Sequence, residues 1–103
     1  MIILIVEDHK RVRELLRQWI EAVFPICKVL EASSGEEAVE VSRINKPQVI
    51  LMDIDLPKMN GIEATKIIKS EQPEAKILVL TMHEGDEYRT SGPVRGVEVP
   101  HMV

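Results

Sequence analysis

Three features that would point to particular classes of protein are missing from this sequence. A single cysteine, Cys27, rules out a disulfide bond within the chain and offers no pair of thiols for a metal. The apolar runs are far too short for a signal peptide or a membrane span. The net charge of -4 gives no reason to expect binding to nucleic acid or to an anionic membrane. We therefore expect a cytoplasmic protein of a reducing compartment that does not associate with membranes.

What the sequence does contain is a set of short apolar segments. Its 103 residues allow one domain with one core. Four segments rich in apolar and β-branched residues predict β-strands, at 2–6, 28–32, 49–53 and 76–81. Three of them are apolar without alternation, which is typical of strands buried on both faces of a parallel sheet. The segment 28–32 is less apolar and is predicted nearer an edge.

The segments between these strands have the spacing of amphipathic helices. The residues predicted to be buried are Val12, Leu15, Leu16, Trp19, Ile20 and Val23 in the first helix, Ala38, Val41 and Ile44 in the second, and Ile62, Ala64, Ile67 and Ile68 in the third. We interpret Trp19 as a core residue, and Arg13 and Arg17 as residues of the solvent side. Ser34 and Glu37 form a candidate capping box. Strands alternating with helices predict an α/β fold, a parallel sheet with helices on both faces.

Polar residues stand at the carboxyl ends of three predicted strands. Glu7 and Asp8 follow the first, Asp53 ends the third and Thr81 ends the fourth. These ends meet at one edge of a parallel sheet, so we expect the carboxylates to lie close together, where like charges need a cation between them. Oxygen ligands of this kind suit Mg²⁺, and a carboxylate held there is a candidate nucleophile toward phosphorus. Thr81 offers a hydroxyl to a phosphoryl oxygen. The alternative is an acidic patch without a ligand.

Three motifs in the right order and spacing resemble the receiver domain of two-component response regulators. They are VEDH at 6–9, LMDIDLPKMNG at 51–61 and LVLT at 78–81. The segment TMHEGDEY at 81–88 is similar to the subgroup that carries a helix-turn-helix DNA-binding output domain. The resemblance covers residues 1–88 and implies a flavodoxin-like doubly wound parallel sheet.

The resemblance also implies a site and a function. Asp53 would be the phosphoacceptor, receiving a phosphoryl group from a histidine kinase or phosphotransfer protein in a signal transduction system that regulates transcription. Thr81 would be the switch hydroxyl. The implied Mg²⁺ ligands are Glu7, Asp8, Asp53 and the backbone carbonyl of Asp55. A receiver of this kind is a signalling protein and not an enzyme.

The sequence departs from the family after residue 88. A complete receiver has five strands and five helices, whereas we expect four clear strands here, with the fifth strand and helices four and five missing or degenerate. In one interpretation, 97–99 is a degenerate fifth strand. In the other, residues from Gly85 or Arg89 onward are unrelated to the family, as after a frameshift or truncation. We favour the second, because no helix can be written through SGP at 91–93, and divide the chain into an incomplete receiver at 1–88 and an atypical tail at 89–103.

Two consequences follow from this departure. No lysine follows Lys76, so the cation that the family places against the phosphoryl oxygens is missing, and we expect impaired switching. Without the fifth strand and fifth helix, the fourth strand becomes an exposed edge and the sheet face beside the first helix is partly bare, which predicts a homodimer or a domain-swapped oligomer. With no output domain expected, we expect no direct binding of nucleic acid by this chain.

Two other functions compete with the receiver. One is an interaction module that keeps the fold without being phosphorylated. The other is a phosphatase, because DID at 53–55 also resembles the first motif of haloacid dehalogenases, with Asp53 as nucleophile and Asp55 as general acid. That family places this motif near the start of a longer chain and needs later motifs that are absent here, so the receiver is the better interpretation.

Overall fold

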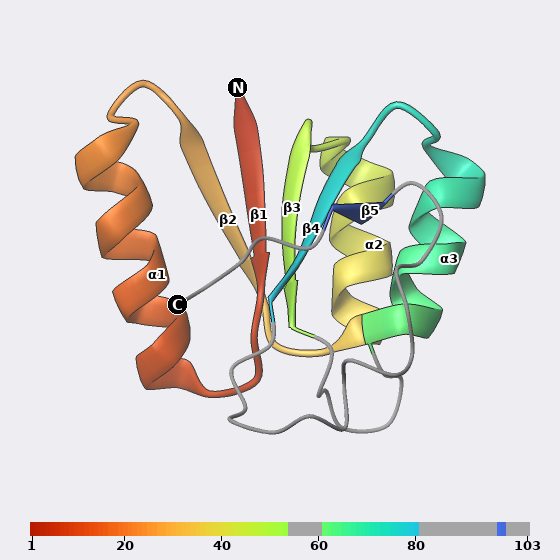
Figure 1. Ribbon diagram of the computed structural model, residues 1–103, viewed down its shortest axis with the longest axis horizontal. Helices are drawn as coiled ribbons and strands as arrows, with labels where there is room; N and C mark the ends of the chain where they lie inside the picture. Colours follow the sequence, from red (N-terminus) through yellow and green to blue (C-terminus); the bar gives the residue numbers. More distant parts are fainter. Residues whose placement is uncertain (54–60, 81–96, 99–103) are drawn as a thin grey trace.

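A parallel β-sheet forms the centre of the protein. The computed structural model describes residues 1–53, 61–80 and 97–98. The strands stand in the order β2-β1-β3-β4-β5 (Figure 1). Their bounds are β1 Ile2–Val6, β2 Lys28–Ala32, β3 Val49–Asp53, β4 Lys76–Leu80 and β5 Val97–Glu98. The four predicted strands are confirmed, with β2 at an edge, and Thr81 lies outside the described residues.

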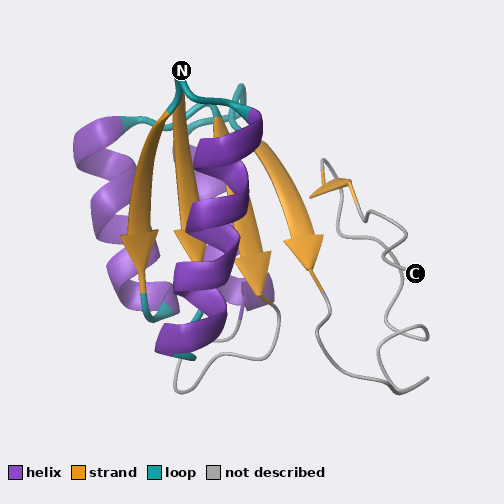
Figure 2. Cartoon of the chain, turned by 90° about the vertical axis from the view of Figure 1, so that its left-hand side faces the viewer, coloured by secondary structure: helices purple, strands orange, loops and turns teal. Residues whose placement is uncertain are grey.

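Helices cover both faces of the sheet, as predicted for a doubly wound fold. Figure 2 shows the sheet between two helical layers, and Figure 1 places α1 (Lys10–Val23) on one side and α2 (Gly35–Asn45) with α3 (Gly61–Glu71) on the other. The strand order is that of flavodoxin-like folds. Within the part of the chain that the structure describes, no helix is both long and apolar enough to span a membrane.

The start of α2 has the predicted cap. The backbone N–H of Glu37 donates to Ser34 Oγ at 3.1 Å, which satisfies one of the free donors of the first turn. The carboxylate of Glu37 accepts in return from the backbone N–H of Ser33 at 2.9 Å, one residue before the position expected in a capping box. The short polar segment between β2 and α2 therefore sets where this helix begins.

The core between the sheet and the pair α2 and α3 is continuous. Its buried apolar residues are Leu4, Val6, Ala32, Ala38, Val39, Ile50, Met52, Ala64, Ile68, Ile77 and Val79. The prediction that Ile44 is buried is wrong, since Ile44 is 72% exposed. The buried side of α2 includes Ser42, and Ile44 lies roughly 200° around the helix from it.

The core between the sheet and α1 is smaller. Its buried residues are Ile3, Ile5, Ile20 and Val29. Contrary to the prediction, Leu15, Trp19 and Val23 are exposed, so Trp19 is not a core residue. The physical reason is that, among the described elements, α1 packs mainly over β1 and β2 and no second helix covers this face.

A short strand lies beside β4. In β5, Val97 pairs with Ile77 and Glu98 pairs with Leu78, in parallel register. The prediction that β4 forms a free edge is therefore wrong at these two positions. β5 lies within the segment 97–99 that the first interpretation of the tail gives as a degenerate fifth strand. Its two residues pair with the middle of β4.

Candidate functional site

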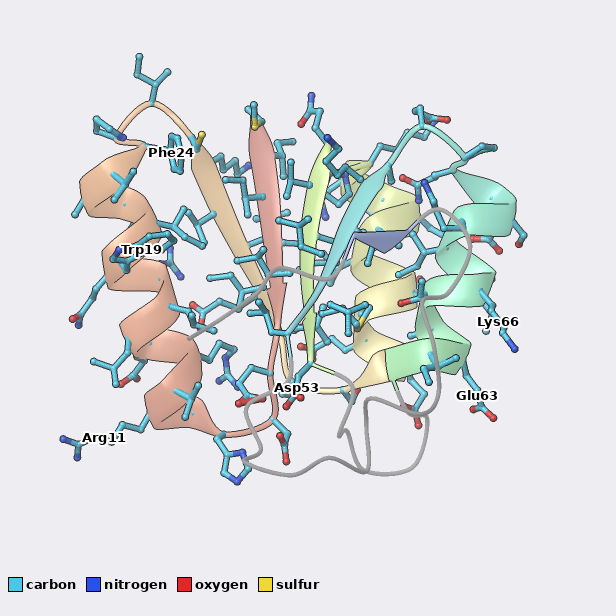
Figure 3. The ribbon with its side chains drawn as sticks, in the orientation of Figure 1. Arg11, Trp19, Phe24, Asp53, Glu63 and Lys66 are labelled. Carbon is cyan, nitrogen blue, oxygen red and sulfur yellow. The ribbon has the colours of Figure 1, made fainter. Side chains whose placement is uncertain are left out.

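Two carboxylates end neighbouring strands on the same face of the sheet. β1 and β3 are paired with Val6 opposite Met52, so Glu7 and Asp53 are the next residues along each strand. Side chains alternate along a strand, and both carboxylates continue the rows of residues that face α1. Glu7 is 2% exposed and Asp53 is 5% exposed. The carboxyl end of the α1 face of the sheet therefore contains a buried acidic pair, and Figure 3 shows Asp53 at this end.

The two carboxyl groups share a hydrogen bond. Burial raises the pKa of Glu7 to about 9, and the hydrogen bond with Asp53 and the negative charges of Asp53 and Asp8 act in the same direction. The backbone N–H of Asp8, which donates to Glu7 Oε2 at 3.1 Å, acts in the opposite direction. Without a cation, the carboxyl of Glu7 is thus protonated at neutral pH and donates to Asp53.

Asp8 presents a carboxylate oxygen that is ready for a ligand. Its Oδ1 is buried and has no hydrogen-bond partner among the described residues. Nδ1 of His9 lies 3.2 Å away, at an ion-pair distance when the imidazole is protonated, but the His9 side chain is 70% exposed. One ligand atom each from Glu7, Asp8 and His9 lies within 4.8 Å of the others. A carboxylate oxygen that accepts no hydrogen bond, beside a buried acidic pair, fits Mg²⁺, whose preference for oxygen favours the two acids over the imidazole.

Arg13 holds the main chain of the acidic pair in place. Its Nη1 donates to the backbone carbonyl of Glu7 at 2.8 Å, and its Nε donates to Glu31 Oε1 at 2.9 Å. From the other side, the backbone N–H of Glu7 donates to the carbonyl of Ala32 at 3.0 Å. Arg13 is predicted from the sequence to lie on the solvent side of α1, yet only 16% of its side chain is exposed.

An acidic partner on β2 explains this position of the arginine. Glu31 accepts hydrogen bonds from both Arg13 and Arg17. Burial alone would raise the pKa of Glu31, but the hydrogen bonds and charges of Arg17 and Arg13 outweigh it and lower that pKa. The signal in the sequence was the spacing of the two arginines, four residues apart on one side of a helix.

The structure brings together three of the predicted site residues. Glu7, Asp8 and Asp53 meet at the carboxyl edge of the sheet, as the parallel arrangement predicted. Asp55 and Thr81 lie outside the described residues. The part of the site that the structure describes is therefore acidic, largely buried and anchored by a guanidinium group from α1.

The sequence matches a family model over most of this fold. A family model described as the response regulator receiver domain matches residues 3–98. The chain belongs to this family. The match continues past residue 88, the predicted end of the domain, and includes both residues of β5. Receiver domains are signalling modules of two-component systems.

Relatives of this receiver domain include transcriptional regulators. The chain is 42% identical over 89 residues to the transcriptional regulatory protein DegU of Brevibacillus brevis. The aligned region covers 85% of the chain and 37% of that relative. It is also similar to the crystal structure of a LuxR-family response regulator from an Aurantimonas species, with 39% identity and a TM-score of 0.77 over 86% of the chain and 64% of the other. The chain thus spans less than half the length of this curated relative.

The fold agrees with isolated receiver domains as well. The response regulator domain of Thermotoga maritima CheB is 32% identical, with a TM-score of 0.79, and the likeness covers 98% of this chain and 79% of that one. The remaining fifth of that domain has no counterpart in the likeness. The described part of the present chain has three helices.

Proposed function

We propose that this receiver domain accepts a phosphoryl group on Asp53 from a histidine kinase or a phosphotransfer protein. The observation that carries the proposal is the buried pair of Glu7 and Asp53 at the carboxyl ends of neighbouring central strands, with an oxygen of Asp8 that accepts no hydrogen bond beside it. In the transfer, an Oδ atom of Asp53 attacks phosphorus while the P–N bond of the phosphohistidine breaks, which leaves an acyl phosphate on the receiver and a neutral histidine on the donor.

The acidic residues around Asp53 are proposed to hold Mg²⁺. Its ligands would be the carboxylates of Glu7, Asp8 and Asp53 and the backbone carbonyl of Asp55. When bound, Mg²⁺ neutralises negative charge on the transferring group. Glu7 must lose its proton for this set of ligands to form, because only the ionised carboxylate binds a metal. Loss of that proton also removes the hydrogen bond that Glu7 donates to Asp53.

Switching after transfer is proposed to be impaired. In this proposal Thr81 turns its hydroxyl toward the phosphoryl oxygens, as the resemblance implies. No lysine follows Lys76 in the sequence, so no ammonium group from the last part of the chain is available to pair with the phosphoryl group. The acceptor and its metal ligands all lie within residues 1–88, and we assign to 89–103 only the short fifth strand.

The absence of that lysine also favours a second candidate function. A receiver fold that is not phosphorylated can act as an interaction module that binds a kinase or another regulator through its surface. In either case we propose that the protein acts in the cytoplasm, in a pathway that regulates transcription, as the name of the Brevibacillus relative indicates. In this proposal the chain itself neither catalyses a reaction nor contacts DNA.

The deciding experiment is incubation with Mg²⁺ and acetyl phosphate, followed by intact-mass measurement and peptide mapping. We expect the added mass of one phosphoryl group on Asp53, lost in Asp53→Asn and retained in the exposed control Glu74→Gln. Asp8→Asn removes a proposed Mg²⁺ ligand, so phosphorylation of this variant should need a higher concentration of Mg²⁺. Metal binding without modification would support the interaction module, and sustained turnover of phosphate esters would support a phosphatase.

A further inference from the structure

The peptide group that joins Glu7 to Asp8 is held by both of its polar atoms. Its carbonyl oxygen, which belongs to Glu7, accepts a hydrogen bond from Arg13 Nη1 at 2.8 Å. Its N–H, which belongs to Asp8, donates to Glu7 Oε2 at 3.1 Å. A peptide group is planar, so a donor that fixes the direction of the carbonyl also fixes the direction of the N–H. The orientation of Arg13 therefore affects how two proposed Mg²⁺ ligands are held.

Glu31 sets the orientation of Arg13 in turn. It lies on the edge strand β2 (Figure 1), paired with Ile5 of β1, whose side chain packs on the α1 side of the sheet. Glu31 Oε1 accepts from Arg13 Nε at 2.9 Å, and Glu31 Oε2 accepts from Arg17 Nη1. Both oxygens of this carboxylate thus bind arginines that are one helical turn apart on α1.

The two contacts of Arg13 make use of the shape of its side chain. Nε and Nη1 belong to one rigid plane and donate in different directions, to Glu31 and to the carbonyl of Glu7. When Glu31 holds Nε, the position of Nη1 is therefore restricted as well. The exposed fractions of the Arg13 and Glu31 side chains are 16% and 24%, so water and salt screen this pair less than they screen a fully exposed one.

We propose that Glu31 is a positioning residue of the Mg²⁺ site, acting through Arg13 on the peptide between Glu7 and Asp8 without binding the cation itself. This inference rests on the Mg²⁺ site of the proposed function and adds to it a residue of the edge strand. Support passes from the carboxylate of Glu31 to the guanidinium of Arg13, then to the carbonyl of Glu7, and through the planar peptide to the N–H of Asp8.

An effect of charge alone would have a different pattern from an effect of position. Removing the negative charge of Glu31 should weaken the binding of a cation, removing the positive charge of Arg13 should strengthen it, and removing both should restore the original affinity. Loss of position instead weakens binding in all three variants, because the peptide between Glu7 and Asp8 loses the same support each time.

The test is calorimetric titration with Mg²⁺ of the original chain, Glu31→Gln, Arg13→Gln and the double variant. We expect each variant to bind Mg²⁺ about tenfold more weakly than the original chain, the lower end of the cost of losing a group that supports a metal ligand. The double variant should be no weaker than the single variants, since the two residues act in series. Original affinity in the double variant, stronger binding by Arg13→Gln, or losses that simply add would each overturn the proposal.

Two further variants serve as controls. Glu21→Gln removes the acidic partner of Arg17 on α1, whose Oε1 lies 3.5 Å from Arg17 Nε, and makes the same change of charge as Glu31→Gln. It should keep the original affinity for Mg²⁺. Arg13→Lys keeps the charge but loses the planar pair of donors, so it should bind as weakly as Arg13→Gln. Original affinity in Arg13→Lys would mean that only charge matters and would overturn the proposal.

Hydrogen exchange of single amides gives a readout without metal. In EDTA, the amide of Asp8 should exchange faster in Glu31→Gln than in the original chain, because its hydrogen bond to Glu7 Oε2 opens more often. The amide of Leu4, a fully buried residue of β1, reports on the sheet as a whole and should be accelerated by a smaller factor. Equal factors at the two amides would show that Glu31 supports the fold in general, which contradicts a positioning role.

The original chain separates this inference from the proposed function. If the original chain and Glu31→Gln bind Mg²⁺ equally well, the role of Glu31 is wrong and the metal site stands. If the original chain binds no Mg²⁺ at millimolar concentrations, the proposed metal site is itself wrong, and the role of Glu31 fails with it.

Discussion

The two faces of the sheet differ in how completely they are covered and in what they carry. The face beneath α2 and α3 has a continuous apolar core, whereas α1 is the one described helix on the other face and leaves its own apolar side exposed. The buried acidic pair of Glu7 and Asp53 lies at the end of the less covered face. One face therefore contains the larger apolar core, and the other combines the buried acidic pair with the exposed apolar side of α1.

The largest expected effect is on stability and separates the two faces. Ile68→Ala, at a fully buried position of α3, should lower the free energy of unfolding by about 3 to 5 kcal/mol, because the surrounding core cannot collapse into the cavity. Ile20→Ala on α1, buried in the smaller core, should cost about 2 kcal/mol, since its neighbours are free to move. Urea denaturation measures both. Equal losses of unfolding free energy in the two variants would contradict the proposed difference between the two faces.

The acidic pair makes the stability of the metal-free protein depend on pH. Between pH of about 4.5 and about 9, the folded protein keeps a proton on Glu7 that the unfolded chain has lost, so the free energy of unfolding falls as pH rises. The fall is at most about 1.4 kcal/mol per pH unit for one such group.

Glu7→Gln should remove most of this slope and raise stability at neutral pH, since a neutral amide fills the same site. Urea denaturation across that pH range in the presence of EDTA is the measurement, with the exposed residue Glu74 changed to Gln as the control. Added Mg²⁺ should stabilise the original chain more at high pH than at low pH, because binding displaces the proton. A variant with the same slope as the original chain would show that Glu7 is not its source.

Arg13 connects the less covered face to the acidic site. Arg13→Gln should weaken Mg²⁺ binding by about tenfold, the lower end of what loss of a supporting hydrogen bond to a metal ligand costs. Arg17→Gln is the matched control, because among the described contacts Arg17 reaches Glu31 and Glu21 but not Glu7. Titration of the original chain and both variants with Mg²⁺, followed by calorimetry or NMR shifts, distinguishes them. Equal losses would mean that only the link to Glu31 matters.

The smallest expected effect lies in the covered face. The side-chain hydroxyl of Thr65, on α3, is fully buried and has no hydrogen-bond partner among the described residues. Thr65→Val keeps the shape and removes the unsatisfied group, so it should raise the free energy of unfolding by about 1 kcal/mol. The shift in the urea midpoint at constant slope checks it. A loss of stability would indicate that the hydroxyl has a partner, such as an ordered water.

Much of the fold follows from the sequence because its signals are local. Unbroken apolar runs identified β1, β3 and β4, and the polar Ser34 marked the start of α2. The convergence of Glu7 and Asp53 was also predictable, because it requires only that neighbouring parallel strands end at one edge. The roles of Asp55 and Thr81 stay predictions, since they lie outside the described residues.

What the sequence could not reveal depends on contacts between distant segments. Trp19 and Ile44 each continue the apolar pattern of their own helix, which predicts an apolar side. The pattern does not show whether another element packs against that side. Arg13 looked like a solvent residue because its partners, Glu31 and the carbonyl of Glu7, are set by how α1 sits on the sheet. The sequence suggested a strand at 97–99 as one of two interpretations of the tail, but two paired residues are too short to give a periodic signal that would decide between them.

The hydrogen bond from Arg13 to the carbonyl of Glu7 links the position of α1 to the acidic site. On one side the helix supports the main chain of the acidic pair, and on another it exposes the apolar side chains of Leu15, Trp19 and Val23. If a contact on that exposed side favours one position of α1, it must alter the affinity of the acidic site for a cation. By thermodynamic reciprocity, the cation then alters the strength of that contact by the same factor. The guanidinium group of Arg13 would thus couple contacts on the exposed side of α1 to occupancy of the metal site.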